Sequence, residues 1–208
     1  MLFDDLKYKR KEWQNRNKIV DLNKGWMWLT VPVNSTSLTK LNEVRIDTSI
    51  NWQKKHWNAI MTNYNKTFFF KHYKNFFKKV YSRRWDILVN LNKTIIMYIL
   101  KELKIQTKIV ESSKLNLEDK KTNLIIKMCK QLRADCYLSG KSGHEYLDEQ
   151  KFSENGVTLL YQDFFPSVYP QRITPFIPNM SVIDLMFNMG NKESRRLILE
   201  SGSITQVN

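Results

Sequence analysis

The sequence predicts an α/β fold, built on a mostly parallel sheet flanked by helices. From Ile105 onward, strand-like and helix-like segments alternate at the spacing of β–α–β units. Before them, residues from about 49 to 103 have helical periodicity and are expected to form a basic helical insertion. The chain has 208 residues, of which 42% are hydrophobic, and this is enough for one buried core. We therefore expect one α/β domain over residues 1–190 and a polar tail over residues 191–208.

The first half of the chain predicts short strands followed by helices. Residues 1–3 resemble the end of a buried strand, and further strands are expected at 17–21, 26–33 and 44–46, with a turn at 23–25. Thr48 or Ser49 is expected to cap a helix that ends near Tyr64. Two more helices are expected at about 68–81 and 87–103.

The second half predicts the main sheet. Strands are expected at 104–110, 135–139 and 157–162, and helices at 117–133, 146–155 and 182–189. Ser181 is expected to cap the last helix and Gly190 to close it. Ligands of such sheets bind beyond the carboxyl ends of the strands. The loops that follow these three strands are therefore candidate binding loops.

Positive charge is concentrated in the first half. The formal net charge is +14; residues 1–110 hold 22 basic and 8 acidic side chains, and the remaining residues hold 12 of each. No acidic residue occurs between Asp47 and Asp86, where lysines and arginines alternate with aromatic residues. This pattern fits a solvated face over an ordinary core, a site for an anionic small molecule or membrane surface, or a nucleic-acid site. Nucleic acid is disfavoured because no helix-turn-helix, RNA-binding aromatic motif or zinc finger is present.

Several classes of protein are excluded by the motifs. Cys129 and Cys136 have neither the spacing of metal ligands nor that of a disulfide framework, so no metal or other cofactor is expected. The apolar run 94–100 is far shorter than the ~20 residues that span a bilayer. With no signal-peptide pattern, a cytoplasmic location is expected. The sequence lacks the Gly-x-Ser-x-Gly motif of many serine hydrolases and the spacing of a P-loop.

Three segments contain candidate site residues. In Asn15-Arg16-Asn17, Arg16 could bind a phosphate or carboxylate, or could form an internal ion pair with Asp5. His56 could act as a base, although a single helical histidine is more often structural. The segment from Ser139 to His144 could cradle a phosphate with its backbone N–H groups or could be a flexible turn.

The order of short motifs along the chain carries a resemblance. The motifs are Asp4-Asp5, Asn15-Arg16-Asn17, Leu29-Thr30-Val31-Pro32-Val33, Lys55-His56, Ser112-Ser113, Tyr137-Leu138-Ser139-Gly140, Tyr161-Gln162-Asp163, Tyr169-Pro170-Gln171, Phe176-Ile177-Pro178 and Ser181 to Gly190. In this order they resemble the WbqC-like protein family of bacterial surface-polysaccharide loci. The resemblance covers nearly the whole chain. Family members usually begin with a strand and a His/Gln-x-Pro-x-Tyr-Leu-Pro-Trp loop, which this sequence lacks, so an N-terminally incomplete domain is expected.

The resemblance implies a cytoplasmic enzyme of O-antigen or capsule biosynthesis. The expected activity is a transferase that places an acyl or aminoacyl group on a nucleotide-linked amino sugar, an anionic substrate. The catalytic candidates are His56 and Asp5. The substrate-binding candidates are Asn15, Arg16, Asn17, Arg45, Lys55, Ser112, Ser139, Gly140, Asp163, Tyr169 and Gln171. The alternative is a non-catalytic basic module that binds nucleic acid or anionic lipid, which would include peripheral membrane contact.

Overall fold

The computed structural model describes residues 1–36 and 38–206, and the chain folds into two compact units. The larger unit consists of Asp4–Lys108 and Val168–Ile198. The smaller unit consists of Met1–Phe3, Ile109–Ser167 and the residues from Leu199 onward. Within the described residues, the larger unit holds two two-stranded sheets and two buried apolar clusters, and the smaller unit holds a three-stranded sheet and one such cluster.

A β-hairpin lies at the centre of the larger unit. Strands β1 (Arg16–Asp21) and β2 (Gly25–Thr30) pair antiparallel from Arg16↔Thr30 to Asp21↔Gly25. The predicted turn between them is confirmed, and Gly25 has a φ of +87°, a conformation that glycine adopts without strain. A second antiparallel pair joins β3 (Val33–Asn34) to β4 (Arg45–Ile46).

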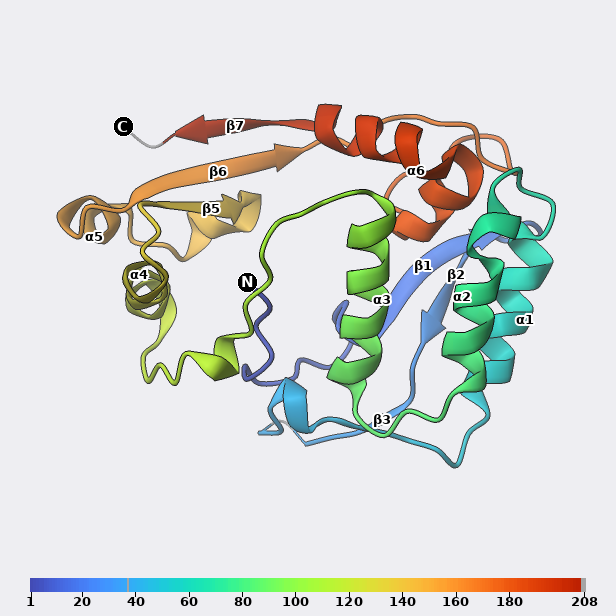
Figure 1. Cartoon of the computed structure of the whole chain (residues 1–208), viewed down its shortest axis with the longest axis horizontal. Helices are drawn as coiled ribbons and strands as arrows, with labels where there is room; N and C mark the ends of the chain where they lie inside the picture. Colours follow the sequence, from blue (N-terminus) through green and yellow to red (C-terminus); the bar gives the residue numbers. More distant parts are fainter. Residues whose placement is uncertain (37, 207–208) are drawn as a thin grey trace. The chain divides into compact units, whose positions relative to one another are not determined.

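Helices cover the hairpin. They are α1 (Trp52–Tyr64), α2 (Phe70–Ser82), α3 (Leu88–Glu102) and α6 (Val182–Glu200), and Figure 1 shows β1 and β2 between α3 and the α1–α2 pair. The inward face of the hairpin packs on aromatic side chains of α1, α2 and α6, among them Tyr64, Tyr73 and Phe187. The cap of α1 is Asn51, whose side chain accepts a hydrogen bond from the Lys54 amide, and not Thr48 or Ser49 as predicted. The Ser49 hydroxyl instead donates a hydrogen bond to the Asp47 carboxylate.

Helix α6 bends at Gly190. This residue has φ 72° and ψ 178°, which are not helical values, so the helix predicted at 182–189 is interrupted at Gly190, where it was expected to close. The chain then resumes a helix as far as Glu200 and forms β7 (Gly202–Gln206). Residues 191–208 were predicted as a polar tail, and 207–208 lie outside the described residues. Residues 191–200 are instead helical, and β7 pairs antiparallel with β6 from Leu160↔Gln206 to Phe164↔Gly202.

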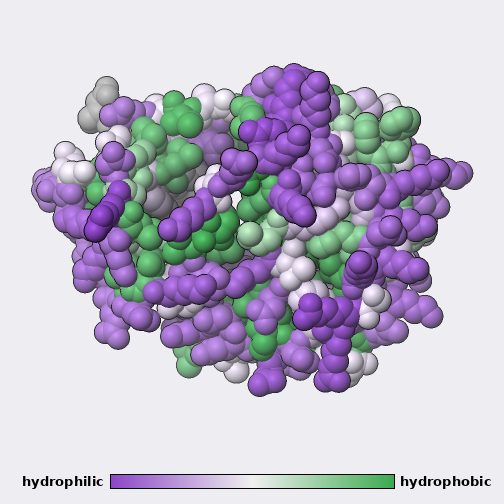
Figure 2. Space-filling view, in the orientation of Figure 1, coloured by the Kyte–Doolittle hydropathy of each residue, from purple (hydrophilic) through white to green (hydrophobic). Residues whose placement is uncertain are grey.

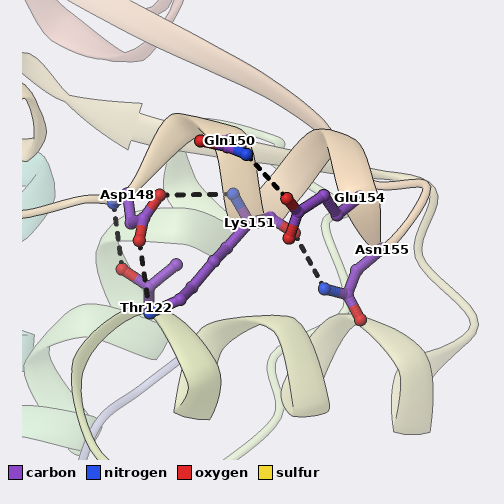
Figure 3. Close-up of polar contacts among 6 residues, drawn as sticks. All are labelled: Thr122, Asp148, Gln150, Lys151, Glu154 and Asn155. Atoms are coloured by element: carbon purple, nitrogen blue, oxygen red, sulfur yellow. Dashed lines mark hydrogen bonds and ion pairs between the residues drawn. The ribbon is translucent and has the colours of Figure 1, made fainter.

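The smaller unit contains a three-stranded sheet in the order β5-β6-β7. Strands β5 (Cys136–Gly140) and β6 (Thr158–Phe164) are parallel, and α4 (Lys121–Leu132) and α5 (Glu149–Glu154) pack against them around Phe152 and Tyr161. Polar contacts join the two helices (Figure 3): the Asp148 amide donates to the Thr122 hydroxyl, and the Asp148 side chain caps α5. Leu2 forms a parallel bridge with Glu111.

The α/β class is confirmed, but the expectation of a mostly parallel sheet is not. Of the strand pairs in the described residues, β5–β6 is parallel, whereas β1–β2, β3–β4 and β6–β7 are antiparallel. The strand predicted at 104–110 does not form. Among the described residues, its strand-type pairing is limited to the Val110 carbonyl, which accepts a hydrogen bond from the Leu2 amide at 2.8 Å beside the Leu2–Glu111 bridge. At its start, the carbonyls of Leu103 and Lys104 accept hydrogen bonds from the Arg195 side chain.

Candidate functional site

A pocket of about 310 Å³ lies in the larger unit. Its size is at the lower end of the range for small-molecule sites. One side is aliphatic and aromatic, and the other is a polar rim formed by the segment that leads into β1. The apolar lining is Ile19, Leu29, Val31, Trp52, Phe77, Tyr81, Leu91, Ile95, Ile96, Ile99, Val182 and Ile183. The remaining lining residues are Trp13, Gln14, Asn15, Arg16, Asn17, His56, Asn92 and Ser181.

Hydrogen bonds to the backbone hold the polar rim. The Asn15 side-chain amide donates to the Val31 carbonyl at 2.9 Å, and the Val31 amide donates back to the Asn15 carbonyl at 2.8 Å. From α3, the Asn92 side chain donates to the Gln14 carbonyl at 2.8 Å. These bonds fix residues 14–16 against β2 and α3, so the rim is preorganised.

Arg16 has a partly unsatisfied guanidinium group. One terminal nitrogen donates to the Lys11 carbonyl, and the guanidinium carbon lies 4.2 Å from the ring centroid of Trp28. Among the described residues, its Nε is a buried donor with no acceptor. A buried N–H without an acceptor is costly, so an oxygen atom of a ligand would be favourable at this position.

Trp52, another lining residue, also carries a buried donor without an acceptor among residues 1–36 and 38–206. It is 2% exposed, and within the described part of the chain its indole Nε1 has no hydrogen-bond partner. Its ring packs edge-on against His56 at a centroid distance of 5.2 Å. Two residues of one lining therefore each carry a buried donor without an acceptor in the described chain, and acceptor oxygens are what such donors lack.

His56 is buried in the pocket wall. Its Nε2 lies 3.0 Å from the Thr30 carbonyl oxygen. Since a carbonyl only accepts, Nε2 carries the proton and Nδ1 keeps its lone pair. Burial lowers the pKa of His56 to about 4, although the hydrogen bond to Thr30 partly opposes this. His56 is therefore neutral near pH 7 and suited to accepting a hydrogen bond.

An aromatic cluster continues outward from the rim. Trp13 is 56% exposed, and its ring lies 5.2 Å from that of Trp28, which in turn lies 5.8 Å from Trp26. The Lys18 ammonium is 4.4 Å from the centroid of Trp26. Trp28 and Lys18 are directly opposite in the β1–β2 register, so the hairpin places cations and indoles on one face.

The structure thus brings together four of the predicted site residues: Asn15, Arg16, Asn17 and His56 line one pocket. Asp5, Arg45 and Lys55 belong to the same unit but not to this lining. Arg45 is exposed on β4, and Lys55 is exposed on α1 beside His56. A direct role for these three residues stays a prediction.

Tyr169 and Gln171 meet at a buried carboxylate. The Tyr169 hydroxyl donates to Asp184 Oδ2 at 2.7 Å, and the Gln171 amide donates to the same oxygen at 2.9 Å. Gln171 also binds the backbone of Ile177 in both directions. Burial raises the pKa of Asp184, and the hydrogen bonds from its neighbours oppose this shift by stabilising the charge. In this arrangement the two side chains anchor the loop before α6.

Four further candidates lie in the smaller unit: Ser112, Ser139, Gly140 and Asp163. The Ser139 hydroxyl donates to the Gly140 carbonyl at 3.1 Å, and a Cβ at Gly143 would lie 2.1 Å from that hydroxyl, so this turn is tightly packed. Asp163 forms an ion pair with Lys141 at 3.7 Å. His144 stacks on Tyr161 at 3.5 Å between ring centroids. These contacts within the smaller unit account for the side chains without a ligand. A ligand role for the four residues stays a prediction.

Asn92 and the indole nitrogen of Trp52 were not predicted from the sequence as parts of the site. Asn92 is a polar residue in the otherwise apolar stretch of α3 that faces the pocket, which was an available signal. The unpaired state of the Trp52 indole has no sequence signal, because it depends on neighbours that come from elsewhere in the chain.

Residues 1–36 and 38–206 include no group of three or more His, Cys, Asp or Glu side chains arranged to hold a metal ion. Within the same residues, no helix has the length and apolarity needed to cross a membrane.

Comparison with known proteins gives one family. The model of the WbqC-like protein family matches residues 1–196, which include every lining residue of the pocket. This chain belongs to the WbqC-like protein family. It is also 32% identical over 194 residues to the uncharacterized protein Rv1507c of Mycobacterium tuberculosis, a match that covers 91% of this chain and 83% of that protein. No solved structure matches the chain. Membership of the WbqC-like family points to a polysaccharide-related function.

Proposed function

We propose that this WbqC-like protein is a transferase of surface-polysaccharide biosynthesis that binds a nucleotide-linked amino sugar in the pocket of the larger unit. The observation that supports this most directly is the pair of buried, unpaired donors in the lining, Arg16 Nε and Trp52 Nε1. A pyrophosphate and sugar hydroxyls provide the acceptor oxygens that these donors lack. Arg16 is the cation of the lining, and its charge matches a phosphate.

The aliphatic side of the pocket supports an acyl or aminoacyl group as the group transferred. In such a step, the amine nitrogen of the sugar forms a bond to the acyl carbon of an activated ester or thioester donor. The donor C–O or C–S bond breaks, and the proton lost by the amine goes to the leaving alkoxide or thiolate. The isoleucines and leucines from β1, β2 and α3 would bury the apolar part of the acyl group.

His56 is proposed to orient the acceptor. In the neutral form described above, Nδ1 accepts a hydrogen bond from an amine or hydroxyl, while Nε2 stays bound to Thr30. A pKa of about 4 keeps the ring uncharged near pH 7, so Nδ1 retains the lone pair that accepts this hydrogen bond. Positioning of the nucleophile is a recognised source of rate enhancement.

Binding can be tested with UDP-linked and dTDP-linked amino sugars, measured by thermal shift and titration calorimetry on the full chain. A ligand at about 100 times its Kd stabilises the folded state by about 2.7 kcal/mol, which raises Tm by several degrees. Arg16→Met is expected to weaken binding by roughly 10- to 100-fold, because a hydrogen bond to a charged group is lost.

The matched control is Arg10→Met. Arg10 is an exposed arginine of the same unit whose side chain donates to the Ser35 carbonyl at 2.7 Å, and it does not line the pocket. This variant is expected to bind like the wild type. If no sugar nucleotide stabilises the protein, or if both variants lose affinity equally, the proposed function is wrong.

A further inference from the structure

A second surface of the larger unit is strongly basic, and the pocket does not use it. It consists of Lys66, Lys71, Lys74, Lys78 and Lys79, on the turn before α2 and on α2 itself, and is called the basic face below. The larger unit holds 26 basic and 10 acidic side chains, whereas the smaller unit holds 8 and 10, so the excess of positive charge belongs to the larger unit.

The helical repeat places three of these lysines on one side of α2. Lys71, Lys74 and Lys78 follow one another at intervals of three and four residues, and this side lies next to the buried side that holds Phe70, Tyr73 and Phe77. Lys71 and Lys78 are exposed, and Lys74 is half-buried. Figure 2 shows mainly hydrophilic residues, with some hydrophobic ones among them, over the side of the larger unit that carries α1 and α2. The lysine side chains of the basic face have no hydrogen-bond or ion-pair partner among residues 1–36 and 38–206.

The nearby carboxylate does not neutralise this face. Glu102, at the end of α3, has a side chain that is only 16% exposed, and its Oε2 lies 2.8 Å from His72 Nε2. The same oxygen accepts a hydrogen bond from Asn191 at 2.8 Å. Glu102 is therefore engaged by His72 and Asn191, and the lysine charges remain directed to solvent.

An apolar side chain lies beside the lysines. Phe68, in the turn between α1 and α2, is 85% exposed, the highest value among the large hydrophobic side chains of the described residues. Its ring packs edge-on against Phe69 at a centroid distance of 4.8 Å, and the Phe69 amide donates to the Phe187 carbonyl at 3.2 Å, so the turn that presents Phe68 is attached to α6. An exposed phenylalanine with Lys66 and Lys71 two and three residues away in the chain suits the boundary between lipid headgroups and acyl chains.

We propose that the basic face docks this protein on a membrane surface that contains anionic lipid, with Phe68 inserted among the headgroups. Charge complementarity carries the assignment: a lipid surface is a diffuse negative charge that lysine ammoniums neutralise without bidentate geometry. Lysines form the face, and the two arginines that follow α2 are engaged elsewhere: Arg83 lies over the Trp85 ring and Arg84 pairs with Asp86. Phosphates of nucleic acid are commonly bound by the planar fork of arginine. The proposal is independent of the ligand in the pocket, since Phe68 and the lysines do not line it.

The test is co-sedimentation of the full chain with vesicles of phosphatidylcholine alone and with vesicles in which about one-third of the lipid is phosphatidylglycerol. The wild type is expected to bind only the anionic vesicles, and less as salt rises from about 0.15 M to about 0.5 M. The triple variant Lys71→Gln, Lys74→Gln, Lys78→Gln is expected to lose about fivefold in partitioning for each lysine. At high salt, where the apolar contribution dominates, Phe68→Ser is expected to bind the anionic vesicles roughly tenfold more weakly than the wild type.

The control is the triple variant Lys9→Gln, Lys24→Gln, Lys108→Gln, which lowers the net charge by the same amount. All three lysines are exposed, belong to the larger unit and lie outside the basic face. This control is expected to bind within about twofold of the wild type. Circular dichroism and thermal melting verify that each variant is folded. The proposal would be overturned if both triple variants lost the same fraction of vesicle binding, or if the wild type did not bind anionic vesicles. It would also be overturned, in favour of nucleic acid, if Phe68→Ser bound vesicles like the wild type and duplex DNA displaced the protein from them.

Discussion

A buried histidine at the pocket wall links the site to the stability of the protein. His56 is 4% exposed, and its folded-state pKa of about 4 is below the ordinary value of 6.5. Between these two values the unfolded chain binds a proton at His56 and the folded chain does not. The free energy of unfolding therefore falls as the pH drops from about 6.5 to about 4, and this contribution is constant above pH 6.5.

His56→Gln is expected to reduce the acid-induced decrease in the free energy of unfolding by up to about 3 kcal/mol, since glutamine does not titrate. Urea unfolding at a series of pH values between 4 and 7 measures this free energy for the wild type and the variant. The raised pKa of Asp184 acts in the opposite direction, but it is present in both proteins and cancels in the difference. Parallel pH dependence in the wild type and the variant would show that His56 is not held neutral by burial.

The break in α6 depends on one glycine. At φ 72° and ψ 178°, Gly190 occupies a backbone region that other residues almost never adopt, and a Cβ there would lie 2.7 Å from the Phe69 ring. Gly190→Ala is expected to lower the free energy of unfolding by at least about 1–3 kcal/mol. Chemical denaturation measures the change.

Gly140→Ala is the matched control for Gly190→Ala. Gly140 has a φ of −74°, and a Cβ there would meet no atom within 4 Å. Its free energy of unfolding is expected to change by no more than about 0.5 kcal/mol. A Gly190→Ala protein as stable as this control would mean that α6 runs through residue 190 without a break.

Across the whole molecule, the candidate residues are divided between two units. Asn15, Arg16 and His56 lie in the larger unit, and Ser139 and Asp163 in the smaller one. With a sugar nucleotide that stabilises the protein, amide hydrogen exchange is expected to slow in residues 13–17 and 52–56, because a ligand in the pocket suppresses local opening there. Mass spectrometry of peptic fragments measures this. Protection confined to residues 139–140 and 163 would contradict the proposed pocket and favour the strand-end loops.

Local pattern and turn chemistry were sufficient for most of the elements. The β1–β2 turn, the three helices between residues 52 and 102 and the end of a helical segment at Gly190 could all be predicted, because each depends on neighbours a few residues apart. The strand at 104–110 and the tail after 190 were predicted wrongly. Both depend on pairing: residues 104–110 have strand composition but form no ladder, whereas the polar residues 202–206 become β7 because β6 has a free edge beside them.

The sequence by itself determined the α/β class, the resemblance to the WbqC-like family and the basic character of the first half, since composition, periodicity and motif order are properties of the linear chain. It also indicated Asn15-Arg16-Asn17 and His56 as candidates. Only the tertiary structure decided that these residues share one apolar-walled pocket, that Tyr169 and Gln171 bind Asp184, and that Arg16 Nε and Trp52 Nε1 lack acceptors. Burial and hydrogen-bond satisfaction depend on groups distant in sequence, and folding alone brings those groups together.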